Sequence, residues 1–117
     1  MKYTTSTPIY MQVADSVKEK IVTGELSPGD KLPSGRDLAL AYTINPNTAA
    51  RVYQILEQEQ VSFTKRGLGT FVTEDPERIR LLRSEMAEGL LEQFLSGIER
   101  LGISKEEAIE MIKEKEG

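Results

Sequence analysis

The chain has 117 residues and a mass of 13.1 kDa, which suits one small domain or a small domain with a short extension. Hydrophobic residues make up 38% and charged residues 29%, an ordinary soluble composition, and the absence of cysteine and histidine excludes disulfides, thiolate or imidazole metal sites and the Ser-His triad. The formal net charge of −4 leaves nucleic acid open as a partner, because a mildly acidic domain can still present a basic face.

This composition favours a binding module over an enzyme, and we expect no cofactor and no metal. No apolar run approaches the roughly 20 residues that span a bilayer, and the N-terminus lacks a signal-peptide core, so we expect a cytoplasmic protein without a membrane partner. Five helices are predicted from capping side chains that precede a proline or an acid. These starts are Thr7-Pro8, Ser34 with Asp37, Asn45-Pro46, Asp75-Pro76, and Ser104 with Glu107.

The first two predicted helices are amphipathic. The first is expected to stop at Gly24, and its apolar face comprises Ile9, Tyr10, Val13, Ala14, Val17 and Ile21. The second, about Gly35 to Tyr42, is expected to bury Leu38 and Ala41. Only two residues separate it from the next cap at Asn45, and two short helices joined so tightly predict a helix-turn-helix.

The third predicted helix, about Pro46 to Gln60, has two contrasting faces. Its apolar side comprises Ala49, Val52, Tyr53 and Leu56. The opposite side carries Asn47, Arg51, Gln54 and Gln58 with Thr48 beside them, while the acids Glu57 and Glu59 lie off that line. Amides, a hydroxyl and a guanidinium match the donors and acceptors that read base edges in a major groove. The alternative is a polar exterior that happens to be rich in amides.

Two strands are predicted next, from Val61 to Lys65 and from Thr70 to Val72. The connection Arg66-Gly67-Leu68-Gly69 contains glycines that permit the positive φ of a tight hairpin. Lys65 and Arg66 lie at its tip with no acid nearby in the sequence. Basic glycine turns are common on protein surfaces, but a basic hairpin after a polar-faced helix is typical of the wing in a winged helix-turn-helix, which reaches the DNA backbone or minor groove.

Residues 8–72 resemble the DNA-binding domain of the GntR family of bacterial transcription regulators. The matching motifs are Pro8-Ile9-Tyr10-x-Gln12, Gly24-x-Leu26-x-Pro28-Gly29-Asp30-Lys31-Leu32-Pro33-Ser34-x-Arg36-x-Leu38-Ala39, Asn47-Thr48 with Arg51, and Arg66-Gly67-x-Gly69-Thr70-Phe71-Val72. Asn45-Pro46-Asn47-Thr48 with a short helical extension is most similar to the YtrA subfamily, which implies a compact dimeric repressor, often of an ABC transporter operon. Gln60-Val61-Ser62 departs from the family in lacking the usual glycine before the wing strand.

The resemblance and the residue pattern together give a predicted DNA-binding set. It comprises Ser34, Arg36, Asn45, Asn47, Thr48, Arg51, Lys65, Arg66, Gly67 and Gly69. Ser34 caps the second helix and its hydroxyl is able to meet a phosphate, whereas the role of Arg36 is implied by the resemblance alone. Arg51 either takes guanine O6 and N7 in a bidentate pair or holds a phosphate, and the sequence leaves both open.

A helical segment follows Asp75, and it carries a long apolar stripe. A helix from Pro76 to Leu101 and a second from Lys105 to about Lys115 are too short to fold alone, so the stripe is expected to pair with a second copy. The predicted dimer interface comprises Ile79, Leu82, Met86, Leu90, Leu91, Phe94, Leu95, Ile98, Ile109 and Ile112. The alternative is one hydrophobic helix folded back over residues 1–72. An effector is left open: either it binds between the paired segments, lined by Phe94, Leu91 or Met86, or there is none.

The predicted fold class is mainly α with a small β-hairpin. Residues 1–74 are expected to form a winged helix-turn-helix DNA-binding domain, and residues 75–117 a two-helix dimerisation tail. The predicted function is a repressor that binds double-stranded DNA at a palindromic operator as a homodimer. The alternatives are a winged-helix module for protein–protein contact, non-specific architectural DNA binding, which the negative charge disfavours, and, remotely, an enzyme.

Overall fold

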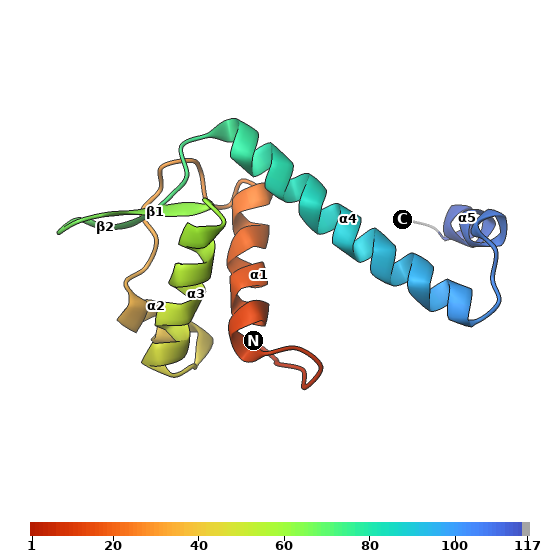
Figure 1. Cartoon of the computed structure of the whole chain (residues 1–117), viewed down its shortest axis with the longest axis horizontal. Helices are drawn as coiled ribbons and strands as arrows, with labels where there is room; N and C mark the ends of the chain where they lie inside the picture. Colours follow the sequence, from red (N-terminus) through yellow and green to blue (C-terminus); the bar gives the residue numbers. More distant parts are fainter. Residues whose placement is uncertain (116–117) are drawn as a thin grey trace. The chain divides into compact units, whose positions relative to one another are not determined.

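The computed structural model describes residues 1–115, in which five helices accompany one two-stranded antiparallel sheet. The elements are α1 (Ile9–Val22), α2 (Gly35–Tyr42), α3 (Pro46–Gln58), β1 (Ser62–Lys65), β2 (Gly69–Val72), α4 (Pro76–Arg100) and α5 (Lys105–Glu114) (Figure 1). The predicted fold class, mainly α with a small hairpin, is confirmed. The chain divides into two compact units, here called the head (Met1–Leu82) and the tail (from Arg83 onward). The functional division into residues 1–74 and 75–117 stays a prediction.

The head is built on three helices that share one apolar core. α3 packs against both α1 and α2, and its buried residues Ala49, Val52 and Leu56 are those predicted from its periodicity. The rest of the core consists of Val13, Ala14, Val17, Ile21, Leu32, Leu38, Ala39, Tyr42, Val61, Val72 and Leu82. Burial of this set supplies the hydrophobic stabilisation that lets a unit of this size fold.

One prediction of burial is wrong. Ala41 of α2 is exposed, and α2 instead buries Leu38, Ala39 and Tyr42, because the helix rests on α3 by a face rotated from the predicted one. Ile9 is 44% exposed and Tyr10 is half-buried, so the first turn of α1 lies at the edge of the core and not within it.

The predicted helix starts are observed, with one difference in chemistry. Ser34 Oγ accepts the Asp37 N–H, Ser104 Oγ accepts the Glu107 N–H, and Asp75 Oδ1 accepts the Glu77 N–H. At α1, however, the cap residue is Pro8, which has no side-chain acceptor, so Thr7 does not cap this helix as predicted. The segment before α1 is held instead by the Gln12 amide, which donates to the carbonyl oxygens of Thr4 and Thr7.

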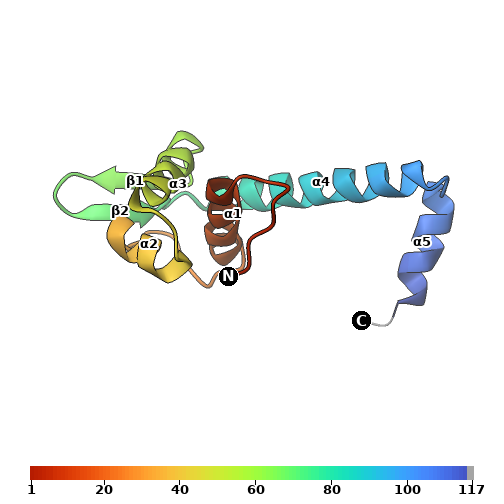
Figure 2. The same ribbon diagram turned by 90° about the horizontal axis from the view of Figure 1, so that it is seen from below.

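The hairpin pairs Phe63 with Phe71 and Lys65 with Gly69. An isolated bridge from Lys31 to Phe71 adds the loop before α2 to the edge of β2, because the Leu32 N–H donates to the Thr70 oxygen and the Val72 N–H to the Asp30 oxygen. In both views the hairpin extends away from α1, α2 and α3 (Figures 1 and 2). α3 ends two residues earlier than predicted, and Gln60 then takes a φ of 60°, a left-handed conformation that favours glycine.

An ion pair and a side-chain to backbone bond connect the elements around the end of α3. Lys18 of α1, 9% exposed, places Nζ 2.6 Å from Oε1 of Glu59, and Arg78 Nε donates to the Glu59 carbonyl oxygen at 2.9 Å. The first turns of α4 are thereby tied to the head, and Leu82 completes its core.

The tail contains the rest of α4 followed by α5. Gly102, with a φ of 73°, lets the chain leave α4, and the Ile103 N–H closes the helix end on the Ile98 oxygen. α5 buries Ala108, whereas Leu90, Leu91, Phe94, Leu101, Ile109, Met111 and Ile112 are exposed. No helix of residues 1–115 has the length and apolar character needed to cross a membrane.

Candidate nucleic-acid interface

The turn between α2 and α3 fixes the orientation of the exposed helix. Thr43 adopts a φ of 54°, which ends α2 sharply, and Asn45 Oδ1 accepts the Asn47 N–H at 2.7 Å, which starts α3. A hydrogen bond fastens the middle of α3, since the hydroxyl of the half-buried Tyr53 donates to the Pro33 carbonyl oxygen. Burial, followed by the proximity of Tyr42 and Asp37, raises the pKa of Tyr53 well above its usual value, so it stays a neutral donor. The helix-turn-helix is therefore held rigidly on both sides of the turn.

The predicted polar face of α3 is at the surface. Asn47, Arg51, Gln54 and Gln58 are exposed, and Thr48 is half-buried beside them. Asn45 is exposed as well, but its side chain is engaged as the cap. Because the face carries amide donors and acceptors on a rigid helix, it has the chemistry that distinguishes one base edge from another.

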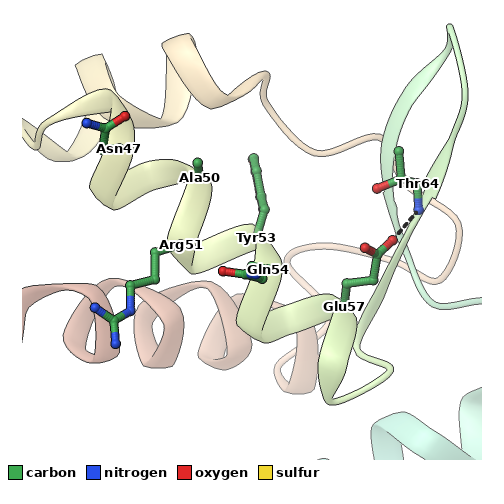
Figure 3. A pocket seen from close by; sticks show the side chains of 7 residues that line it. All are labelled: Asn47, Ala50, Arg51, Tyr53, Gln54, Glu57 and Thr64. Atoms are coloured by element: carbon green, nitrogen blue, oxygen red, sulfur yellow. Dashed lines mark hydrogen bonds between the residues drawn. The ribbon is translucent and has the colours of Figure 1, made fainter.

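A groove of about 730 Å³ runs between α3 and the hairpin. Its lining comprises Asn47, Ala50, Arg51, Tyr53, Gln54, Glu57 and Thr64 (Figure 3). Ala50 contributes a small methyl group, which leaves this side of the helix open to an approaching ligand. The groove lies within the head and brings the polar face of α3 and one face of β1 to the same opening.

Glu57, predicted to lie off the line of polar side chains on α3, lines the groove beside that face. Its Oε1 accepts the Thr64 N–H at 3.2 Å, which connects the last turn of α3 to β1. Figure 3 shows the carboxylate directed toward Thr64. The acid therefore fixes the hairpin against the helix. Glu59, by contrast, is taken up by Lys18 away from the groove.

Arg51 leaves α3 on the side of α1. Its guanidinium lies 3.9 Å from the centre of the Tyr10 ring, and Nη2 donates to the Tyr10 hydroxyl at 3.2 Å. In Figure 3 the side chain points toward the α1 ribbon, opposite to Ala50 and Tyr53. The sequence placed Arg51 on the polar face but gave no sign of this contact with the first helix.

The hairpin presents the predicted basic tip. Lys65 and Arg66 are exposed, and the Leu68 N–H donates to the Lys65 oxygen across a turn in which Gly67 has a φ of 79°. Lys65 Nζ lies 5.2 Å from the centre of the Phe71 ring, which itself stacks on Phe63. The aromatic pair therefore attracts the cation to the face of the wing.

Lys31 is a further cation beside the wing, and its position there was not predicted from the sequence. Its Cε would lie 2.9 Å from a Cβ at Gly69, so the lysine stem occupies the space that any larger residue would need there. Gly69 also has a φ of 124°, which favours glycine independently. Lys31 stands in the short extended piece before α2, which the sequence predicted. Its pairing with β2 is a long-range contact, which the sequence does not reveal.

Ser34 and Arg36 lie at the start of α2, and both are exposed. Ser34 Oγ is engaged as an acceptor for Asp37, which leaves its hydroxyl hydrogen free to donate. Within residues 1–115 no three His, Cys, Asp or Glu side chains gather closely enough to hold a metal ion.

The residues predicted for a dimer interface fall into three groups by exposure. Leu90, Leu91, Phe94, Ile109 and Ile112 are exposed, and Ile79, Met86, Leu95 and Ile98 are half-buried. Leu82 is 1% exposed and belongs to the core of the head. The exposed group lies wholly in the tail.

A helix-turn-helix followed by a basic hairpin, with a polar groove between them, defines a winged-helix DNA-binding protein. The comparisons with known proteins agree, since residues 9–72 match the family model described as "Bacterial regulatory proteins, gntR family". The chain belongs to the GntR family of bacterial transcription regulators, which are not enzymes.

The similarity to individual relatives extends beyond the head. The HTH-type transcriptional regulator YhcF of Bacillus subtilis is 41% identical over 96% of this chain and 93% of its own, and the HTH-type transcriptional repressor YtrA of the same organism is 39% identical over 93% and 85%. The solved structure of a GntR family transcriptional regulator from Listeria monocytogenes superposes with a TM-score of 0.90 at 41% identity, over 97% of this chain and 100% of the other. The protein is thus a DNA-binding transcription regulator, as the sequence predicted.

Proposed function

We propose that this protein is a sequence-specific repressor that binds a palindromic operator as a homodimer. The observation that carries the proposal is the groove between α3 and the wing, where Asn47, Gln54 and Thr64 offer neutral donors and acceptors on rigid elements. Major-groove edges are read by such groups, since each base pair presents a distinct pattern there. The likeness to YtrA, named a repressor, supports repression.

The remaining site residues are proposed to hold the DNA backbone. Lys65 and Arg66 at the wing tip, with Gly67 and Gly69 shaping the turn, approach the flanking backbone or minor groove, and Ser34 and Arg36 meet a phosphate from the start of α2. Such contacts fix the register of α3 on the duplex, whereas the groove residues select the sequence.

We place this activity in the cytoplasm and, from the resemblance to the YtrA subfamily, at an operon for an ABC transporter.

The homodimer is proposed from the exposed apolar side chains of the tail. Leu90 is 68% exposed, and Leu91, Phe94, Ile109 and Ile112 are exposed with it. A short helical unit that exposes several large apolar side chains is normally covered by a partner, and the same residues on a second copy are able to pair about a two-fold axis. Two heads related in this way read half-sites about one helical turn apart, which gives a palindromic operator.

Selection of bound sites from random double-stranded DNA tests the reading of sequence. We expect an inverted repeat to be enriched, and Asn47→Ala to flatten the preference at one position in each half-site, by about 1–3 kcal/mol. Gln93→Ala, which removes an exposed amide from the tail, is the matched control and should leave the profile unchanged. Failure of the wild-type chain to enrich any sequence would contradict the proposal and favour the module for protein–protein contact.

Sedimentation at micromolar concentration tests the dimer. Leu90→Glu is expected to convert a dimer into a monomer, because a carboxylate would be buried unpaired in the interface. Leu40→Glu makes the same change at a leucine of α2 that is 71% exposed, and this variant should remain dimeric. A wild-type chain that sediments as a monomer would refute the homodimer.

A further inference from the structure

We infer that Arg51 and Tyr10 together form a binding site for a backbone phosphate at the edge of the groove, so that Arg51 holds the DNA and does not read a base. The inference rests on the proposed function, because it assigns one part of the DNA to one pair of side chains. It also adds α1, which lies outside the helix-turn-helix, to the binding surface.

The contact between the two side chains is made in two ways. The guanidinium stacks 3.9 Å from the centre of the Tyr10 ring, and Nη2 donates to the hydroxyl oxygen at 3.2 Å. Stacking on an aromatic face fixes the plane of the guanidinium, so less side-chain entropy is lost when a ligand binds. Tyr10 is thus a positioning residue for Arg51.

The donors that remain suit an anion. A guanidinium has five N–H groups, and this contact uses one of them. Because the Tyr10 oxygen accepts from Arg51, its own hydrogen is free to donate to an oxygen placed beside the guanidinium. No ion pair of residues 1–115 involves Arg51, so within the described part of the chain its guanidinium has no carboxylate partner. The guanidinium and the hydroxyl lie side by side, so a phosphate is able to accept from both while it meets the positive charge.

The position of the pair favours the backbone over the bases. Figure 3 shows Arg51 directed toward α1, while Ala50 and Tyr53 leave the helix on the opposite side and the carboxylate of Glu57 faces the wing. The major groove is about 12 Å wide, so a side chain that leaves the inserted helix sideways meets the sugar-phosphate backbone. Base reading is then left to Asn47 and Gln54, which line the groove with Arg51 but, within residues 1–115, form no hydrogen bond with α1.

The test measures operator affinity as a function of salt, together with base preference, on the full chain. Arg51→Ala should weaken binding to all sequences by a similar factor and reduce the slope of log K against log salt by about 0.9, the value for one lost phosphate contact. Arg51→Lys keeps the charge and should keep the slope. Tyr10→Phe keeps the stacking ring and should weaken binding by a few-fold without changing either the slope or the base preference.

Loss of preference at a single base pair in Arg51→Ala, or an unchanged salt slope, would overturn this inference and leave the proposed function intact. If Tyr10→Phe binds like the wild type, the hydroxyl is not part of the site and the two-residue assignment is wrong. A wild-type chain without sequence preference would instead overturn the proposed function itself. Thermal unfolding of each variant distinguishes these outcomes from loss of the fold.

Discussion

The head and the tail differ in how far their apolar side chains are exposed. The head buries leucine, valine and isoleucine between α1, α2, α3 and the hairpin, and Leu56 and Val52 are completely inaccessible. The tail, although helical throughout most of its length, leaves Leu90, Phe94 and Ile112 exposed. Secondary structure therefore forms in both units, but the single chain completes a core in the head alone.

Under the proposed dimer, this difference separates the part of the function that needs a second copy from the part that does not. A unit that buries its own apolar surface presents the same binding groove whatever the protein concentration. A unit that does not do so gains its stability from a partner, by mass action. DNA reading by one head is therefore expected to survive dilution, whereas cooperation between two heads is not.

Truncation of the two leucines gives the largest expected contrast. Leu56→Ala, at a fully buried position, should lower the free energy of unfolding by about 2–5 kcal/mol, because it removes packing and leaves a cavity. Leu90→Ala should cost less than about 0.5 kcal/mol in the monomer and should act mainly through dimerisation. Urea unfolding of both variants over a hundredfold range of protein concentration distinguishes a loss of stability within one chain from a loss of dimerisation. If Leu90→Ala lowered the free energy of unfolding as much as Leu56→Ala at every protein concentration, the proposed difference between the head and the tail would be contradicted.

Titration of Tyr53 sharpens the description of the head. Burial raises its pKa, so the folded state favours the neutral phenol. The resulting contribution to the stability of the fold is fully present below about pH 10, and it is lost as the pH rises through the pKa of the folded state. Tyr53→Phe should cost about 1 kcal/mol at pH 7, because the Pro33 oxygen loses its donor, and should flatten the alkaline fall in stability. The measurement is chemical unfolding between pH 7 and 11, and an unchanged alkaline slope in the variant would count against the raised pKa of Tyr53.

Helix caps offer a comparison with matched chemistry in both units. Ser34 and Ser104 each accept an N–H three residues later at 3.1 Å, so Ser34→Ala and Ser104→Ala remove the same bond from the head and the tail. Each should cost about 1 kcal/mol of helix stability. We expect the first loss to appear in unfolding of the head and the second in the dimer dissociation constant. If Ser34→Ala and Ser104→Ala raised the dimer dissociation constant equally, the head and the tail would not be independent units.

The strained residue at the end of α3 gives the smallest effect. Gln60 has a φ of 60°, and Gln60→Gly should raise the stability of the head by about 0.5–1 kcal/mol, because glycine adopts this conformation without a Cβ penalty. Gln93→Gly, on the exposed surface of α4, is the control and should be destabilising by about as much. Differential scanning calorimetry measures both changes.

Local rules predicted most of the elements. The caps at Ser34, Asn45 and Ser104 and the apolar spacing of α3 depend on residues within one or two turns, and the structure agrees at each. The polar face of α3 and the basic tip of the hairpin were predicted on the same basis. Burial of Ala41 was predicted wrongly because periodicity defines a face but not how far the packed helix rotates about its axis.

Long-range contacts could not be predicted in this way. The approach of Lys31 to Gly69, the stacking of Arg51 on Tyr10 and the position of Glu57 at β1 each join residues from different elements. Their sequence separation carries no periodic signal, so the three-dimensional fold is needed to find them. Leu82 shows the same limit, because a single apolar stripe in α4 serves the core of the head at one end and exposed surface at the other.

Binding to a full operator and to a half-site tests the central claim most directly. The account holds that two heads, joined through their tails, read one inverted repeat together. Wild-type protein should bind the complete repeat at least about a hundredfold more tightly than DNA with one half-site scrambled, and Leu90→Glu should lose this advantage. Equal affinity of the wild-type protein for both DNAs would contradict the account.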